Sequence, residues 1–226
     1  MTASAQLPTS GVPVPELSWA DTNMRSFMNE NDISAGLLAI SRNGVIVYQR
    51  GFGYYNADES IDLPENALVR IASCTKPFTG AAIQKLAIEF EFDMHDNAFD
   101  LGQPGGGLLP HDPFPSLGDS RLRDVTVFQL LTHEGGWDRS DPNTDWTYEE
   151  CRIADDMNIT SPPGRSNTLR WILGQPLQFT PGTGSAYSNI GYLTAGLIVE
   201  EVAGVGLLTY LRENILTPEM WVPSTD

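Results

Sequence analysis

The pattern of apolar and polar positions predicts one helix and two strands in the early part of the chain and mostly helices in the rest. A helix is expected from Ser18 to about Asn29, with Ser18 as its N-cap, because apolar residues recur there every three or four positions. Two β-rich runs follow at 36–41 and 45–50, and the Asn-Gly pair between them is a strong signal for a hairpin. Before them, residues 1–16 are rich in Pro, Ser and Thr and are expected to form a loose arm.

The later part of the chain is expected to be mostly helical. A helix with a buried apolar stripe should begin near Ser73, and Pro77 is tolerated there because it falls in the first turn. Residues 138–168 are largely polar. A two-stranded hairpin alone is not stable in water, and no convincing set of strands follows Gly53, so the predicted sheet lacks partners in this sequence. The other predicted helices lie at 126–132, around 148–157, at 190–202 with Gly204 as the C-cap, and at 207–215.

Composition and charge narrow the class of protein. The hydrophobic share of 41% and the charged share of 19% are ordinary for a globular protein, and no apolar stretch reaches the length of a membrane span. The formal net charge of −16 repels nucleic acid and anionic membranes, so we expect neither as a partner. Only Lys76 and Lys85 are lysines. An acidic, lysine-poor surface suits a salty environment, and compositional drift is an equal alternative.

The N-terminus and the cysteines add little. The first fifteen residues contain neither a basic residue nor an apolar run, so they are not a signal peptide, and the sequence leaves a cytoplasmic and an exported mature protein open. Cys74 and Cys151 fit no metal or redox motif and are expected to be free thiols.

Ser73-Cys74-Thr75-Lys76 is a candidate for nucleophilic chemistry. Residues three apart share one face of a helix, so the hydroxyl and the amine are expected to lie close together. A serine hydroxyl needs an adjacent base, and an amine serves as one only when burial or a neighbouring cation lowers its pKa. Alone, the tetrapeptide is a weak signal, and a capping Ser with a solvated Lys is the ordinary alternative. This lysine-poor chain nevertheless places one of its two lysines there, at the head of an apolar helix.

Tyr187-Ser188-Asn189 is a second candidate. It stands between a Pro-Gly loop and the apolar helix at 190–202. A phenol beside an ammonium loses its proton more easily and can relay protons, and an Asn offers a donor and an acceptor to a substrate carbonyl. The tripeptide is also weak by itself, since Tyr54-Tyr55-Asn56 matches the same pattern and is interpreted as packing at a strand end.

Three segments in order resemble the serine β-lactamase and penicillin-binding-protein superfamily, which includes class C β-lactamases, DD-peptidases and β-lactamase-like esterases. The nucleophile segment is Val-Arg-Ile-Ala-Ser-Cys-Thr-Lys-Pro-Phe at 69–78. A middle segment, Leu-Leu-Thr-His-Glu-Gly-Gly, stands at 130–136, and Phe-Thr-Pro-Gly-Thr at 179–183 precedes the Tyr-Ser-Asn tripeptide. Order and spacing agree over about 36–218.

The resemblance implies an α/β fold of the α+β type, in which a mixed sheet flanked by helices adjoins an all-helical lobe. The arm, helix and hairpin at 1–72 would belong to the first lobe, and 73–226 would form the mostly helical one. Ser73 would attack a carbonyl, Lys76 would accept its proton, Tyr187 would protonate the leaving group, and Asn189 would hold the substrate. The Ser73 backbone N–H would serve as one oxyanion donor, and no metal or cofactor would be needed.

The chain departs from the family at its third motif. A Lys-Thr-Gly or His-x-Gly sequence on a late strand is missing, since no lysine follows Lys85 and the one His-x-Gly is at 133–135. The late strand would also supply the second oxyanion donor. We therefore expect a further, C-terminal polypeptide to complete the sheet and the site, either after cleavage near Asp226 or because the sequence is truncated there.

Three functions are compatible with these residues. The first is a serine hydrolase that cleaves small esters or amides through an acyl-enzyme on Ser73, the second a true β-lactamase, and the third a non-catalytic β-lactam sensor or scaffold. A metal site is set aside. His133-Glu134 has no HExxH spacing and His133 is interpreted as structural, and Asp138, Asp141 and Asp145 do not fit a calcium loop.

Overall fold

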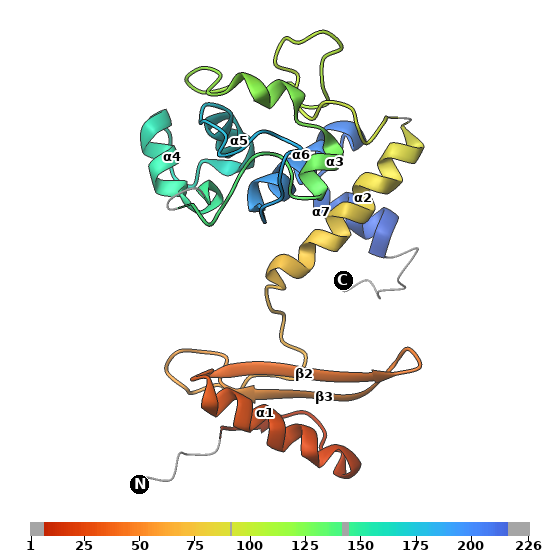
Figure 1. Ribbon diagram of the computed structural model, residues 1–226. Coiled ribbons are helices and arrows are strands. Elements are labelled where there is room, and N and C mark those ends of the chain that lie inside the picture. Colours follow the sequence, from red (N-terminus) through yellow and green to blue (C-terminus); the bar gives the residue numbers. More distant parts are fainter. Residues whose placement is uncertain (1–6, 91, 142–144, 217–226) are drawn as a thin grey trace. The chain divides into compact units, whose positions relative to one another are not determined.

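The computed structural model describes residues 7–90, 92–141 and 145–216. It divides into two compact units, residues 1–71 and residues 72–226. A mixed α/β content, with seven α-helices and a small antiparallel sheet among the described residues, agrees with the fold class expected from the sequence. Figure 1 shows the helices of the second unit and the sheet of the first, with the helices and strands β2 and β3 labelled.

The first unit is a three-stranded sheet with one helix. The predicted hairpin is present as β2 (Ala35–Arg42) and β3 (Val45–Gly53). Asn43 and Gly44 both have positive φ, at 53° and 77°, which is the conformation that an Asn-Gly hairpin turn requires. The register shifts by one residue between Ile40 and Ser41, so the pair contains a bulge.

Two sequence-based expectations for this unit are wrong. The N-terminal arm is not loose throughout, because Thr9 and Ser10 form β1 (Thr9–Ser10) and pair antiparallel with Phe52 and Gly51 of β3. The strand order is therefore β1-β3-β2. Ser18 does not cap the following helix, α1 (Ser18–Glu30), since the N-cap is Leu17 and makes no side-chain hydrogen bond.

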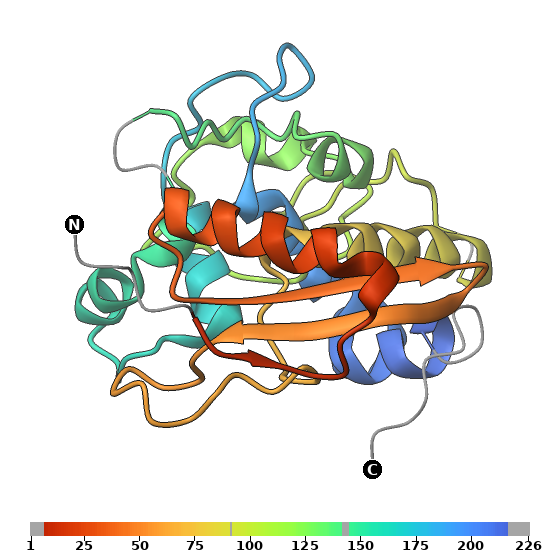
Figure 2. The same ribbon diagram turned by 90° about the horizontal axis from the view of Figure 1, so that it is seen from below.

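Helix α1 covers one face of this sheet, as Figure 2 shows. A Cβ atom built on Gly36 of β2 would lie 2.5 Å from the methyl carbon of Met24, so the strand and the helix approach closely because a glycine stands there. Met28 of the helix and Phe52 of β3 are both 0% exposed and form the centre of this small core.

The second unit is built around α6 (Asn189–Ala203), whose apolar residues are buried on most sides. Gly204 ends this helix with φ of 68°, as the sequence predicts for a C-cap glycine. The remaining helices are α2 (Lys76–Glu89), α3 (Val127–Leu131), α4 (Glu150–Met157), α5 (Gly164–Leu173) and α7 (Leu207–Leu211), which continues as a π turn over Arg212–Leu216. In Figure 1, α2 and α3 lie beside α6.

Helix α5 was not expected from the sequence. Its first turn, Gly-Arg-Ser-Asn, follows two prolines and lacks apolar side chains, so the pattern there indicates a loop. Its second half buries Leu169, Trp171 and Ile172. Helix α3 follows the prediction closely. Thr126 is its N-cap, and Thr126 and Gln129 exchange the two hydrogen bonds of a capping box.

Within the described residues, no single helix has both the length and the apolar character of a membrane span. The bent pair Asn189–Ala203 and Leu207–Leu216, which turns by 79° between its halves, meets the criteria only when the halves are taken together. Cys74 and Cys151 are exposed free thiols, as predicted.

Candidate active site

Ser73 lies on a sharp turn at the entry to the second unit. Ala72, directly before it, has φ of 45°, a left-handed conformation that costs a non-glycine residue about 1 kcal/mol. Ala72–Thr75 form a 3-10 turn rather than the first turn of the α-helix, and α2 begins at Lys76 with Pro77 in its first turn. Ser73 is exposed in this turn.

The structure brings the four predicted site residues together. The Ser73 Oγ atom is 2.5 Å from the Tyr187 hydroxyl oxygen, and the Lys76 Nζ atom donates to Ser73 Oγ at 3.3 Å. Lys76 Nζ also donates to Asn189 Oδ1 at 2.7 Å. We call these four residues the Ser73 site. The tetrapeptide is separated from Tyr187 by more than a hundred residues, and the packing of α2 on α6 joins them.

Aromatic rings surround the Lys76 amine. Its Nζ atom is 4.7 Å from the centroid of the Tyr187 ring and 5.6 Å from that of Tyr192. Both distances fall within the range of a cation–π interaction. Tyr192 itself is anchored by a hydrogen bond from its hydroxyl to the Leu131 carbonyl. Lys76 is therefore held on two sides, by rings and by the Asn189 amide, close to the Ser73 hydroxyl.

The Tyr187 phenol is the second polar group on Ser73. Hydrogen bonding to Lys76, followed by hydrogen bonding to Ser73, lowers the pKa of Tyr187 below its usual value of 10. The Arg139 guanidinium, 5.2 Å from the centre of the Tyr187 ring, acts in the same direction. With 38% of the residue exposed, solvent screens part of this effect. A phenol in this environment gives up its proton more readily than a free tyrosine.

His133 contacts the loop that carries Tyr187. Its Nδ1 atom accepts the Ser188 backbone N–H at 3.1 Å, and its ring lies 4.8 Å from the Tyr187 ring. Burial first, and the Lys76 charge second, lower the pKa of His133, so the neutral ring that accepts this bond is favoured. His133 has φ of 64°, and its carbonyl accepts the Ala186 N–H. These contacts are compatible with the structural role expected from the sequence, although no pattern in the sequence indicates which residues His133 contacts.

Asp145 is a site residue that the sequence did not identify. Its Oδ2 atom accepts a hydrogen bond from Asn189 Nδ2 at 2.9 Å, and its Oδ1 atom accepts one from the Thr147 hydroxyl at 2.7 Å. In the sequence, Asp145 is simply one carboxylate in a polar loop, 44 residues from Asn189, and no local pattern links the two. No cluster of three His, Cys, Asp or Glu residues suited to a metal occurs in the part of the chain that the structure describes.

Two pockets adjoin the Ser73 site. The first has a volume of about 330 Å³ and opens beside Ser73, with Thr147, Tyr148 and Leu193 among its lining residues. The second, of about 190 Å³, lies along Lys76 and Tyr192 and reaches Leu207. Both combine an apolar wall with polar groups near the hydroxyl, which is the usual character of a small-molecule pocket.

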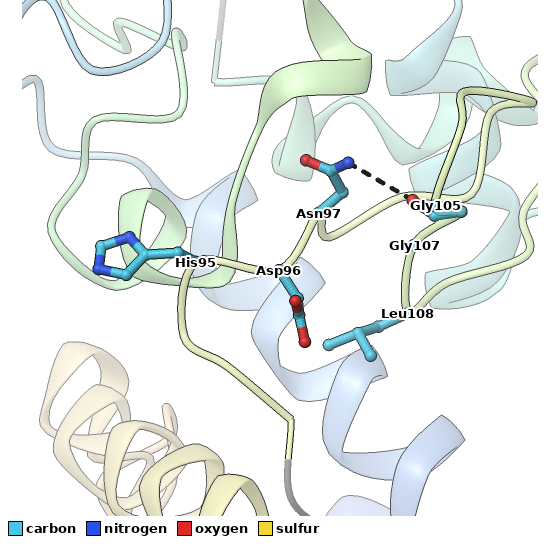
Figure 3. Close-up of a pocket in the computed structure, with 7 residues that line it drawn as sticks. His95, Asp96, Asn97, Gly105, Gly107 and Leu108 are labelled. Carbon is cyan, nitrogen blue, oxygen red and sulfur yellow. Dashed lines mark hydrogen bonds between the residues drawn. The ribbon is translucent and has the colours of Figure 1, made fainter.

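A third pocket lies elsewhere in the second unit. Figure 3 shows it between the segment of His95, Asp96 and Asn97 and the loop that ends at Leu108, with the Asn97 amide directed at that loop. Its volume is about 320 Å³, and it shares no lining residue with the Ser73 site.

Comparisons with known proteins agree with the resemblance seen in the sequence. Protein flp of Staphylococcus aureus (strain COL) is 29% identical over 199 residues, which are 88% of this chain and 36% of that protein. A putative D-alanyl-D-alanine carboxypeptidase of Salmonella heidelberg (strain SL476) is 29% identical over 201 residues, 84% of this chain and 43% of the relative. The chain thus spans less than half the length of these relatives.

Solved structures show the same fold. A penicillin-binding protein homologue from Pyrococcus abyssi, an octamer, superimposes with a TM-score of 0.64 at 25% identity, over 90% of this chain and 43% of its own. A family VIII carboxylesterase superimposes with a TM-score of 0.58 at 21% identity, over 93% of this chain and 51% of its own. The sequence profile of the family described as Beta-lactamase matches residues 20–226. This chain belongs to the beta-lactamase family.

Proposed function

We propose that this chain carries the nucleophile of a serine hydrolase that cleaves small esters or amides through an acyl-enzyme on Ser73. One observation carries the proposal: an exposed serine hydroxyl lies within hydrogen-bond reach of both a lysine amine and a tyrosine phenol. A hydroxyl with two proton-transfer partners is the arrangement that nucleophilic catalysis requires. Membership of the beta-lactamase family supports the same chemistry.

The proposed acylation follows from the distances. Ser73 Oγ forms a bond to the substrate carbonyl carbon, and its proton passes to the lone pair of Lys76 Nζ, 3.3 Å away, when that nitrogen is a neutral amine. The tetrahedral intermediate then collapses, and the bond to the leaving oxygen or nitrogen breaks as Tyr187 protonates that atom. The lowered pKa of Tyr187 helps it to release this proton. Water then attacks the acyl-enzyme carbonyl while Tyr187 takes a proton from it, and the bond to Ser73 Oγ breaks as Lys76 returns its proton to that oxygen.

Asn189 keeps a role in binding the substrate in this proposal. Its Oδ1 atom accepts from Lys76 and its Nδ2 atom donates to Asp145. An amide nitrogen carries two hydrogens, so the second one remains for a substrate carbonyl oxygen. The Ser73 backbone N–H is the proposed first donor to the oxyanion.

A small acyl group fits the pocket beside Ser73. Its volume of about 330 Å³ lies at the lower end of the range for small-molecule sites, and Leu193 supplies an apolar surface. The similar structures include a carboxylesterase and a D-amino acid amidase from Ochrobactrum anthropi. Their names support the ester and amide classes as substrates.

The sheet supports a second part of the proposal, a partner polypeptide. Among the described residues, β2 pairs only with β3, while β1 occupies the other edge of β3, so one edge of β2 is open. Val45 and Ile46 at the start of β3 are 63% and 59% exposed. We propose that C-terminal strands pair with β2 and bring the second oxyanion donor. A purified 24.7 kDa chain that is monomeric and fully active by itself would contradict this partner.

The test of the function compares the protein, assembled with the proposed C-terminal strands, with its Ser73→Ala variant on a p-nitrophenyl ester and on a chromogenic cephalosporin. We expect ester turnover that the variant loses, with a mass increase on Ser73 equal to the acyl group. Rapid turnover of the cephalosporin would instead assign a true β-lactamase, and a lasting adduct without turnover would assign a sensor. Unchanged ester turnover in Ser73→Ala would refute the nucleophile.

A further inference from the structure

The Asp145 carboxylate accepts a hydrogen bond from the side-chain amide of Asn189, and this amide in turn holds Lys76. Asn189 Nδ2 donates to Asp145 Oδ2 at 2.9 Å, and on its other side Asn189 Oδ1 accepts from Lys76 Nζ at 2.7 Å. Asp145 is itself fixed, because the Thr147 hydroxyl donates to its second oxygen at 2.7 Å. Its side chain is 19% exposed. A continuous series of contacts thus runs from Asp145 through Asn189 and Lys76 to Ser73.

The two ends of an amide are not interchangeable in this position. An ionised carboxylate only accepts hydrogen bonds, so it selects the NH₂ end of Asn189. The oxygen end must then face the Lys76 amine, which it accepts from. If the amide turned over, its NH₂ group would meet the Lys76 Nζ hydrogens, and its oxygen would meet the carboxylate. Both contacts would be repulsive, so Asp145 determines which end of Asn189 Lys76 meets.

A second contact links Asp145 to the tyrosine through Arg139. Arg139 Nε lies 3.8 Å from Asp145 Oδ2, and the same guanidinium is 5.2 Å from the centre of the Tyr187 ring. The Arg139 side chain is 50% exposed, so this ion pair adds little stability. The ion pair instead positions Arg139, because it keeps the guanidinium against the Tyr187 phenol that contacts Ser73.

We propose that Asp145 is a positioning residue of the Ser73 site. It orients the Asn189 amide so that Lys76 stays within reach of the Ser73 hydroxyl. This inference rests on the proposed function for its effect on rate, but not for its effect on Lys76. Without the carboxylate only the Lys76 contact orients the amide, and Lys76 is held less firmly. A displacement of about 1 Å at a catalytic group can lower a rate about 100-fold.

The lysine content allows a direct test. The chain has only two lysines, so protein labelled with [ε-13C]lysine gives two methylene signals, one from Lys76 and one from Lys85. Lys76 lies beside the Tyr187 and Tyr192 rings, so we expect its signal to be shifted by ring currents. Lys85 pairs with Glu89 on the other part of α2 and serves as an internal reference. A Lys85→Arg variant assigns the two signals.

In Asp145→Ala we expect the Lys76 signal to move toward the Lys85 position, while the Lys85 signal and the far-UV circular dichroism spectrum stay unchanged. Asp145→Asn, which keeps an accepting oxygen, should give an intermediate shift. Asp155→Asn, an exposed carboxylate on α4, is the matched control and should leave both signals in place. An unmoved Lys76 signal in Asp145→Ala would overturn the proposal, whether or not the chain hydrolyses any ester.

Kinetics on p-nitrophenyl butyrate give the second readout. We expect Asp145→Ala to lower kcat about 10- to 100-fold with little change in KM. If Asp145 acts through Asn189, the same change in an Asn189→Ala background should have less than a twofold effect. Independent, multiplying losses would show that Asp145 does not act through the amide. Absence of any Ser73-dependent turnover would refute the proposed function and leave the lysine signal to decide the present proposal.

Discussion

Asp119 provides a stability prediction that can be worked from the structure. Its carboxylate caps the 3-10 turn at Ser120–Asp124 and accepts from the Arg121 backbone N–H at 2.9 Å. It also accepts from the Arg121 side chain, at 3.0 Å from Nε and 2.6 Å from Nη2, and from the Leu177 N–H at 3.2 Å. The same arginine donates to the Thr180 hydroxyl. The pair therefore ties the turn to the loop that leads toward Tyr187.

The magnitude follows from the acidity of the carboxyl. Hydrogen bonding from the Arg121 side chain, the largest cause, lowers the pKa of Asp119 from 3.8 to about 2. One pKa unit corresponds to about 1.4 kcal/mol, so the interaction is worth at most about 2.5 kcal/mol at neutral pH. The Asp119 side chain is 12% exposed and that of Arg121 is 37% exposed, so screening reduces the value. We expect Asp119→Asn to cost about 1–2 kcal/mol at pH 7.

The direction in which stability changes with pH follows from the lowered pKa of Asp119. Because the folded state holds the carboxyl more acidic than the unfolded chain, the stabilisation is present well above pH 3.8 and is lost as the pH falls through about 2. The linkage relation reduces it to about half at pH 3. A protonated Asp resembles Asn, so wild type and variant should become similar at low pH. Urea unfolding followed by circular dichroism at several pH values measures this difference.

The control is Asp155→Asn, which removes one exposed carboxylate from α4 and should change the free energy of unfolding by less than about 0.5 kcal/mol. The reasoning fails if Asp119→Asn and Asp155→Asn have the same urea midpoint at pH 7. It also fails if the deficit of Asp119→Asn stays constant between pH 7 and about pH 3.

Two further predictions concern the surroundings of the site. Gly191→Ala should destabilise by about 1–2 kcal/mol, since the new Cβ would lie 2.8 Å from the Leu130 carbonyl oxygen, whereas Gly80→Ala, with nothing within 4 Å, should stabilise by up to about 1 kcal/mol; equal urea midpoints would contradict this. His133 has a lowered pKa, so the stability that it confers is complete above the ordinary value of 6.5 and is lost as the pH falls below it. His133→Gln should therefore show a weaker decline of the urea midpoint toward about pH 5, and an unchanged slope would count against this role.

Local signals made much of the fold predictable. Asn43-Gly44 predicted the hairpin because its turn needs two residues with positive φ. Gly204 predicted the end of α6 because the residue that ends the helix also has positive φ. Strand β1 was not predictable, since Thr9 pairs with Phe52 and two short polar residues carry no strand pattern of their own. Helix α5 was hidden because its apolar side chains are concentrated in its second half.

The candidate site also contains some residues that the sequence could identify and others that it could not. Ser73, Lys76, Tyr187 and Asn189 stand in two short motifs, so sequence alone could name them, although not their distances. Asp145 and the contact of His133 depend on pairings across 44 and 55 residues, and no spacing along the chain encodes them. What the sequence misses is therefore the set of residues that hold the reactive groups in place.

The positions of the site residues at the starts of α2 and α6 have a consequence for how such a protein would lose activity on warming. Ser73 lies in the 3-10 turn before α2, Lys76 begins α2 and Asn189 begins α6, and these two helices pack directly on each other within one compact unit. Rotation about a hinge outside this unit leaves their spacing intact. Thermal separation of Lys76 from Asn189 should therefore coincide with melting of the α2–α6 contact itself, with no earlier stage at which both helices persist but these two side chains are already apart.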